Sequence, residues 1–419
     1  MLLVLQIYFV IASVVLFIYA ALKDQNAVRA FSYGLVVNIF PLIWMPSFSM
    51  DAARLAGIPL SYLPFILTGF ALFFRTGGKI KKDYKTLLFL TLLYLLYTLI
   101  TTLFFGKLSI NSLIYYTAWP LNFFIFFAAI SLFSKMDEVR SQKILKTTAL
   151  IIVFGCLAGI FRYLTGISID ANFMPVVNRN GVVVIITMVA PLLFYLYSHK
   201  QISQRVLVIS LITVFICLLL IYSRSGLIGF IFGILFYYFQ PLKKNILKLF
   251  FLLLVLVMAS VVAKGSFDRL DKTFTTVSML INDEEFDSKM GDYKRVKLLK
   301  ISADIIQDNF WLGTGLGLEN YRKAFYKVSD WDFDSKAHNF YFSYFAELGL
   351  IGFFMLMSIF SMIYMKLPPL KSRHRSFRIS FIVVAIMMTM NEYILLPEIW
   401  FFFGILVGIS HRFSNKKLI

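Results

Sequence analysis

Long apolar runs follow one another along most of the chain, separated by short polar stretches. A helix needs about 20 apolar residues to cross a hydrocarbon core about 30 Å thick. Pro41 and Pro46 interrupt the second run, so twelve or fourteen spans are alternatives to the best count of about thirteen. The predicted spans lie at 2–22, 31–50, 59–74, 86–105, 110–133, 144–165, 181–198, 206–222, 225–240, 246–263, 340–365, 377–392 and 397–411.

One long polar stretch, residues 264–338, interrupts this pattern. It holds 12 Lys and Arg and 13 Asp and Glu residues, so it is close to neutral, whereas the whole chain carries a net charge of +19. The sequence therefore predicts three regions. They are an N-terminal transmembrane bundle (1–263), a large extramembrane loop (264–338), and C-terminal transmembrane helices with a short basic tail (339–419).

Composition narrows the class further. Hydrophobic residues make up 59% of the chain, charged residues 15%, and the mean hydropathy is +0.79. Soluble domains are about 45–50% apolar and about 25% charged. In lipid, unpaired backbone polar groups are too costly, which favours helices. We expect an all-α polytopic membrane protein, whose first run, 2–22, lacks a basic n-region and a cleavage site and is a retained span.

The distribution of positive charge predicts the topology. Of the 41 Lys and Arg residues, 24 lie in alternate short connections and the C-terminal tail, 5 in the opposite connections, and 12 in the long loop. Cytoplasmic loops carry the excess of Lys and Arg. The basic connections and the C-terminus are thus predicted to be cytoplasmic, and the long loop extracytoplasmic. This distribution argues against nucleic acid as a partner.

The turn Tyr222-Ser223-Arg224-Ser225-Gly226 lies between two apolar runs, at the predicted outer surface. Charged residues at membrane depth are rare and usually paired or functional. A guanidinium is a planar, permanently charged donor suited to phosphate oxygens. The alternative is an interfacial Arg that extends toward lipid headgroups.

Within the polar loop, apolar residues at 298, 299, 301, 305 and 306 follow a helical spacing. Arg295 lies in the first turns of this predicted helix with Lys294 and Lys297. Cations at a helix N-terminus oppose the helix dipole, and a bound anion would offset that. The alternative is a solvated basic face.

Two further loop motifs are weaker. The glycines of Gly313-Thr314-Gly315-Leu316-Gly317 lack the Lys and Ser/Thr of a P-loop and indicate a tight turn. Asp330, Asp332 and Asp334 resemble the start of a calcium loop, but the sixth position is Ser335 and the twelfth is Tyr341, so an EF-hand fails. We interpret the three Asp residues as a solvated turn, with metal or sugar contact as the alternative. The two cysteines, Cys156 and Cys217, lie in apolar runs, so no Cys-based metal site is expected in the loop.

His338 and Asn339 open the span at 340–365. A His at this position is suited to general-base work near neutral pH, although a lone interfacial His is usually structural. Glu347 lies nine residues further, on the opposite helix face and about 13 Å deeper. It is therefore interpreted as a buried, hydrogen-bonded residue, not as the partner of His338. Glu392 and Glu398 are near enough in the predicted topology to reach the site.

Arg179 starts the span at 181–198 within Asn178-Arg179-Asn180-Gly181, at the predicted outer end. Polar groups here are suited to a headgroup or sugar, and a helix cap is an equal alternative for Asn178 and Asn180.

Taken in order, these motifs resemble the bacterial O-antigen ligase and polysaccharide polymerase superfamily. The resemblance covers about 176–365 and rests on the Arg224 turn, Arg295 ahead of its helix, the 313–317 glycines, and His338-Asn339 leading into Glu347-Leu348-Gly349-Leu350-Ile351-Gly352. It implies a GT-C-like, inverting, metal-independent glycosyltransferase without a cofactor.

The resemblance also implies roles for individual residues and partners. The donor would be an undecaprenyl-diphosphate-linked glycan, presented at the outer face of a bacterial cytoplasmic (inner) membrane. Arg224 and Arg295 would bind the diphosphate, with Arg179 and Asn339 as further substrate-binding residues. His338 would activate the acceptor hydroxyl, as a base or by positioning it. Membrane lipids and other proteins of polysaccharide assembly are the remaining expected partners.

Three functions stay open. A ligase would transfer the glycan to lipid A-core or a similar acceptor in lipopolysaccharide biosynthesis, and is slightly favoured. A repeat-unit polymerase would use the same donor chemistry. A flippase or transporter is less favoured, because transporters tend to place polar breaks near the bilayer midplane, whereas these charges gather at one end and in one loop.

Overall fold

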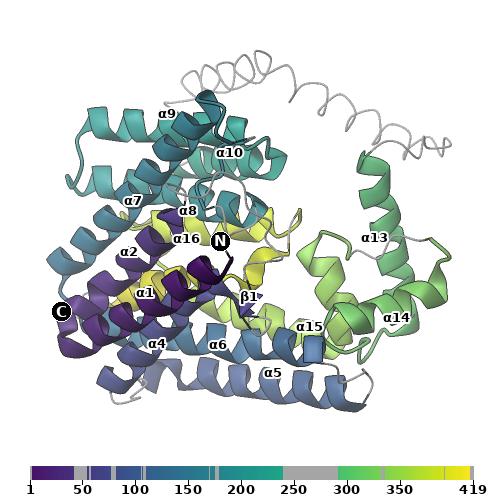
Figure 1. The fold of residues 1–419 in the computed structure, drawn as a ribbon. Helices are drawn as coiled ribbons and strands as arrows, with labels where there is room; N and C mark the ends of the chain where they lie inside the picture. The colour runs from purple at the N-terminus through teal and green to yellow at the C-terminus, as the bar shows by residue number, and fades with distance from the viewer. Residues whose placement is uncertain are drawn as a thin grey trace.

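A computed structural model describes residues 2–41, 54–55, 58–76, 82–104, 106, 110–168, 170–174, 179–238, 291–331, 336–390 and 392–415. Helices form nearly all the regular structure in these ranges (Figure 1). One antiparallel pair of two-residue strands, β1 (Arg54–Leu55) and β2 (Ile58–Pro59), accompanies them. The protein is therefore a predominantly helical, multi-pass membrane protein, as its sequence predicts.

The helices before the polar region are α1 (Leu2–Leu22), α2 (Asp24–Ile39), α4 (Leu63–Thr76), α5 (Lys85–Phe104), α6 (Ile110–Phe133), α7 (Glu138–Leu164), α8 (Arg179–Ser198), α9 (Gln204–Leu220) and α10 (Arg224–Tyr238). Later helices are α13 (Gly291–Asp308), α14 (Leu318–Val328), α15 (Phe340–Lys366), α16 (Ser376–Met387) and α17 (Pro397–Asn415). Three short 3₁₀ turns are Leu60–Tyr62, Lys82–Tyr84 and Tyr393–Leu395.

The predicted spans with described residues all contain a helix. The span at 246–263 and residues 42–50 lie outside the described residues. α2 begins earlier than predicted and ends at Ile39, although Phe40 still has helical φ and ψ and donates its N–H to the Val36 carbonyl. Six helical stretches of the described chain are long and apolar enough to cross a membrane: 3–22, 82–104, 115–133, 138–164, 180–198 and 340–366. The count of thirteen stays a prediction.

Burial separates central from peripheral helices. In α8, 89% of the most apolar window is buried, against 28% in α1 and 33% in α5. Helices that are apolar all round and still exposed face lipid in a membrane protein. The core includes Trp119 of α6 and Trp400 of α17, both fully buried, with ring centroids 6.0 Å apart.

Helices α13 and α14 form a small unit beside the bundle (Figure 1). Leu298, Ile301 and Ile305 of α13 are buried against Tyr321 and Phe325 of α14. Ala346 of α15 completes this cluster. The apolar stripe predicted for this part of the loop is thus confirmed as the buried face of α13, and α15 joins the unit to the bundle.

The glycine turn before α14 packs into a break in α15. Gly349 has φ 64° and ψ −175°, which interrupts the helix. The carbonyl of Ala346 accepts from the Thr314 N–H and that of Glu347 from the Gly315 N–H, both at 3.0 Å. Backbone groups released by a kink need such partners. The predicted tight turn therefore also supplies hydrogen-bond donors to the backbone carbonyls that the break in α15 leaves without helical partners.

Close approach explains the glycine at 313. A Cβ built on Gly313, which has φ 74°, would collide with the backbone of Glu347 and Gly349. On the other side of the break, the Leu350 N–H donates to the Phe310 carbonyl at 2.7 Å. The turn and α15 thus form one rigid junction beneath the start of α15.

Candidate active site

His338 lies in a tight turn immediately before α15, with φ 51°. A non-glycine residue rarely adopts this left-handed conformation, and such residues cluster at functional sites. The turn is held by Asn339, whose side chain accepts from the Phe342 N–H at 3.2 Å and caps α15. The same side chain donates to the Thr389 carbonyl at 2.8 Å. These two contacts of the Asn339 side chain therefore hold the turn that carries His338.

Glu392 supports this turn from the connection between α16 and α17. Its carboxylate accepts a hydrogen bond from the Ser343 hydroxyl. Burial raises the pKa of Glu392, and nearby Lys336 and the backbone N–H groups of His338 and Asn339 partly offset that rise. Glu392, which the sequence placed within reach of the candidate site, thus lies against the His338 turn and the helix that follows it.

Arg295 lies close enough to His338 to act on it electrostatically. Partial desolvation lowers the pKa of the His338 ring below its usual value, and the positive charge of Arg295 lowers it further. Both side chains are exposed. The structure therefore brings together two predicted site residues that are 43 positions apart in the chain, and it favours the neutral, proton-accepting form of His338.

Arg224 is the first residue of α10 and is half-buried. Before it, Tyr222 adopts φ 56°, a second left-handed non-glycine residue, and its hydroxyl hydrogen-bonds that of Tyr163 at 2.6 Å. Ser223 then caps the helix, because its hydroxyl accepts from the Gly226 N–H at 3.3 Å. A cation at a helix N-terminus strengthens an already positive end, which is suited to an anion.

Packing connects α10 to the start of α15 through the end of α16. A Cβ on Gly229 would lie 2.9 Å from the Met387 side chain at the end of α16. The next residue, Met388, accepts from the Phe340 N–H of α15 at 2.9 Å. The end of α16 thus joins the helix of Arg224 to the start of α15.

Arg179 begins α8, which lies beside α10. A Cβ on Gly226 would collide with Val183, so the first turns of these two helices are in contact. Arg179 lies about 6 Å along the helix axis from Val183, at about 1.5 Å per residue. Its backbone is placed at the same end of the bundle as Arg224. Asn178 lies outside the described residues.

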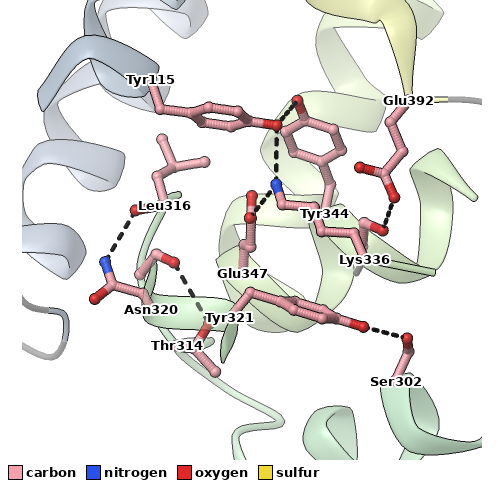
Figure 2. Close-up of polar contacts among 12 residues, drawn as sticks. Tyr115, Ser302, Thr314, Leu316, Asn320, Tyr321, Lys336, Tyr344, Glu347 and Glu392 are labelled. Carbon is pink, nitrogen blue, oxygen red and sulfur yellow. Dashed lines mark hydrogen bonds and ion pairs between the residues drawn. The ribbon is translucent and has the colours of Figure 1, made fainter. Parts of the chain in front are cut away.

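Two residues before His338, Lys336 belongs to a buried polar group that we call the Lys336 cluster: Lys336, Glu347, Tyr115 and Tyr344 (Figure 2). The Lys336 ammonium forms an ion pair with Glu347 and donates to the Tyr115 hydroxyl at 2.8 Å. That hydroxyl lies 3.3 Å from the Tyr344 hydroxyl. Burial alone would lower the pKa of Lys336, but Glu347, Tyr115 and Glu392 together outweigh it and the pKa is raised.

The sequence identified Glu347 as buried and hydrogen-bonded, and it is fully buried in the Lys336 cluster. Its partner Lys336 was not predicted. The available signal was a carboxylate inside an apolar span, which needs a counter-charge, and a Lys eleven positions before it.

Other candidates lie elsewhere. Glu398 is buried in a small cavity among residues of α2, α7 and α8, and no residue of the His338 turn lines it. Asp332 and Asp334 lie outside the described residues. Among residues that the structure does describe, no three His, Cys, Asp or Glu side chains are grouped to hold a metal ion.

Comparison with known families places part of this chain in one family model. Residues 206–357 match the family model described as O-antigen ligase. This range contains Arg224, Arg295, His338 and Asn339, and it ends within α15. The resemblance to the O-antigen ligase and polymerase superfamily is thereby confirmed over these residues. No curated protein matches the chain.

Proposed function

We propose that this chain, whose residues 206–357 match the O-antigen ligase family, is an inverting glycosyltransferase. It transfers a glycan from undecaprenyl diphosphate to an acceptor hydroxyl at the extracytoplasmic face of the bacterial cytoplasmic membrane. Its three regions act as a transmembrane bundle, a loop carrying site residues, and C-terminal helices. No metal or cofactor takes part in the proposed reaction.

The observation that carries this proposal is the proximity of Arg295 and His338. The pKa of His338 is held below its usual value by desolvation and then by Arg295. A ring that is neutral near pH 7 is suited to accept the proton of the acceptor hydroxyl as the glycosidic bond forms. His338 thus acts on the acceptor.

The arginines act on the donor. Arg295 lies about one turn inside α13, and Arg224 begins α10, where the helix dipole and the side-chain charge have the same sign. Such ends bind phosphate oxygens. The pair stabilises the negative charge that develops on the diphosphate as the sugar leaves. Arg179 at the start of α8 adds a third cation on the donor side.

We favour a ligase that uses lipid A-core or a similar acceptor, with a repeat-unit polymerase as the second candidate. Both are served by the same donor site, since the family match covers ligases and polymerases alike. The acceptor added to the reaction distinguishes them.

The test is transfer by the purified full-length protein, with donor binding measured for each variant. His338→Ala should leave donor binding nearly intact and lower the rate by roughly 10²–10⁴-fold. Arg224→Ala should weaken both binding and turnover. Arg224→Lys should restore them only in part, because Lys lacks the bidentate fork. Lys300→Ala, an exposed basic residue further along α13, is the matched control and should retain the wild-type rate.

Two results would contradict the proposal. Full activity in both His338→Ala and Arg224→Ala would remove the site assignment. Loss of activity in EDTA, with recovery on adding magnesium or manganese, would show a metal-dependent reaction. A lipid A-core acceptor and a second lipid-linked repeat unit, supplied separately, report ligase and polymerase activity.

A further inference from the structure

Lys336, two residues before the candidate base, and Glu347, nine residues after it, form a buried pair of opposite charges. Their side chains are 8% and 0% exposed. Removing two charges from water is costly, and well-packed apolar residues often stabilise a fold as well or better. The buried Lys336–Glu347 ion pair is therefore not explained by its contribution to stability alone.

The Lys336 ammonium joins separate elements. It donates to Tyr115 of α6 at 2.8 Å and pairs with Glu347 of α15, while its Nζ lies 5.6 Å from the centre of the Tyr344 ring. An ammonium has three donors and no acceptor, so Lys336 is the donor in its contacts with both Tyr115 and Glu347. The chain just before His338 is therefore fixed to α6 and α15 from the interior.

The chain just after His338 is fixed independently. Asn339 donates to the Thr389 carbonyl at 2.8 Å, and Phe340 donates its N–H to the Met388 carbonyl at 2.9 Å. His338 lies between these two attachments with φ 51°. A non-glycine residue in this conformation costs energy and persists only where its surroundings determine it. The two attachments provide that constraint from opposite sides.

We propose that the Lys336–Glu347 ion pair is a positioning device, which fixes the turn that carries His338 and so orients its ring toward the acceptor hydroxyl. The inference deepens the proposed function and rests on it for the role of His338. Lys336 and Glu347 are positioning residues: they are buried and act through the backbone of the turn.

A positioning role has a kinetic signature. A displacement of about 1 Å in an acting group can cost about 100-fold in rate. Donor binding depends on Arg224 and Arg295, which belong to α10 and α13. Disruption of the ion pair should thus lower kcat and leave donor affinity within about twofold.

The test uses the full-length protein with undecaprenyl-diphosphate-linked glycan, measuring kcat and donor affinity separately. Lys336→Met and Glu347→Gln each leave one buried polar group without its partner, and either variant can fail to fold. The double variant Lys336→Met/Glu347→Leu removes both charges of the pair together and with them the directional contacts. Because Glu392 also loses the nearby Lys336 charge, the folding of this variant is checked by thermal unfolding before kcat is compared. We expect its kcat to fall about 100-fold. Arg140→Met, which removes the exposed Arg140–Asp137 ion pair, is the control and should match wild type.

The outcomes separate this inference from the proposed function. A folded double variant with wild-type kcat, while His338→Ala is inactive, would overturn the positioning role alone. Parallel loss of kcat and donor affinity in the double variant would also overturn it, since that result indicates general disruption. Full activity in His338→Ala would remove the role of His338, and the positioning inference with it.

Discussion

The backbone conformation of His338 fixes the position of its imidazole ring, and the electrostatic surroundings set the pKa of that ring. The turn holds the residue at φ 51°, and desolvation, followed by the charge of Arg295, lowers its pKa. For a base that works in its neutral form, activity falls as pH drops through that pKa. The acid limb of the pH–rate profile should thus lie below the usual His value of about 6.5.

Removal of the neighbouring charge should move this limb. Arg295→Met deletes a cation that disfavours protonation of His338, so the pKa of His338 rises and the acid limb shifts to higher pH. The profile is measured on the residual turnover at saturating donor. Lys300→Met, a charge loss further along α13, should leave the limb in place. A limb that stays fixed or moves to lower pH in Arg295→Met would contradict this account.

Residue types and their order predicted His338, Asn339, Arg224 and Arg295 as candidates, because few charged or titratable groups border apolar runs. Their mutual placement was not predictable, since it depends on how α13 folds back onto α15. The Lys336–Glu347 pair was missed because helical periodicity relates Glu347 only to its own helix. It does not show how far a long Lys side chain reaches from the preceding turn.

At the scale of elements, the break in α15 depends on a backbone contact. A Cβ on Gly349 would lie 2.5 Å from the backbone nitrogens of Gly313 and Leu312, at φ 64°. Gly349→Ala combines left-handed strain of about 1–3 kcal/mol with overpacking of about 1–3 kcal/mol. Gly166 has a similar φ of 73° with nothing within 4 Å of its Cβ position, so Gly166→Ala incurs the strain alone.

The comparison is made by thermal unfolding of both variants in the same detergent. Gly349→Ala should lower the apparent Tm more than Gly166→Ala does. Because the junction lies beneath the start of α15, it should also lower transfer activity, whereas Gly166→Ala should not. An equal decrease in Tm in the two variants would show that the close contact between Gly349 and Gly313 does not add to the cost of the substitution.

Hydrophobic patterning predicted helix positions well, since most boundaries differ from the expected spans by only a few residues. It failed at the Gly349 break because the sequence from 340 to 365 is predominantly apolar and an isolated glycine in such a run does not by itself predict a break. The hydrogen bonds that compensate the break come from residues 310–315, a long-range pairing that no local pattern encodes.

For the whole molecule, charge distribution predicts that α13 is extracytoplasmic and that the connection between α15 and α16 is cytoplasmic. Single cysteines at Lys300 and Lys371, both exposed, test this with a membrane-impermeant thiol reagent. In intact cells position 300 should label and position 371 should not, until the membrane is permeabilised. The native Cys156 and Cys217 are buried and give little background. The reverse labelling pattern would invert the topology and place His338 in the cytoplasm.

Composition sufficed to predict the class, because a chain this apolar must place its helices in lipid. It did not determine the number of spans, since helices such as α10 and α16 are short for a full crossing.

The break in α15 also affects the bilayer around the protein. Ala346 and Glu347 contact the α13–α14 unit and the glycine turn before it, and the unbroken helix after Gly349 is 350–366, about 25 Å at about 1.5 Å per residue. That is shorter than a hydrocarbon core of about 30 Å, and a short helix is matched by local thinning of the lipid. Beside α15, the bilayer is therefore expected to be thinner than around the longer apolar helices of the protein.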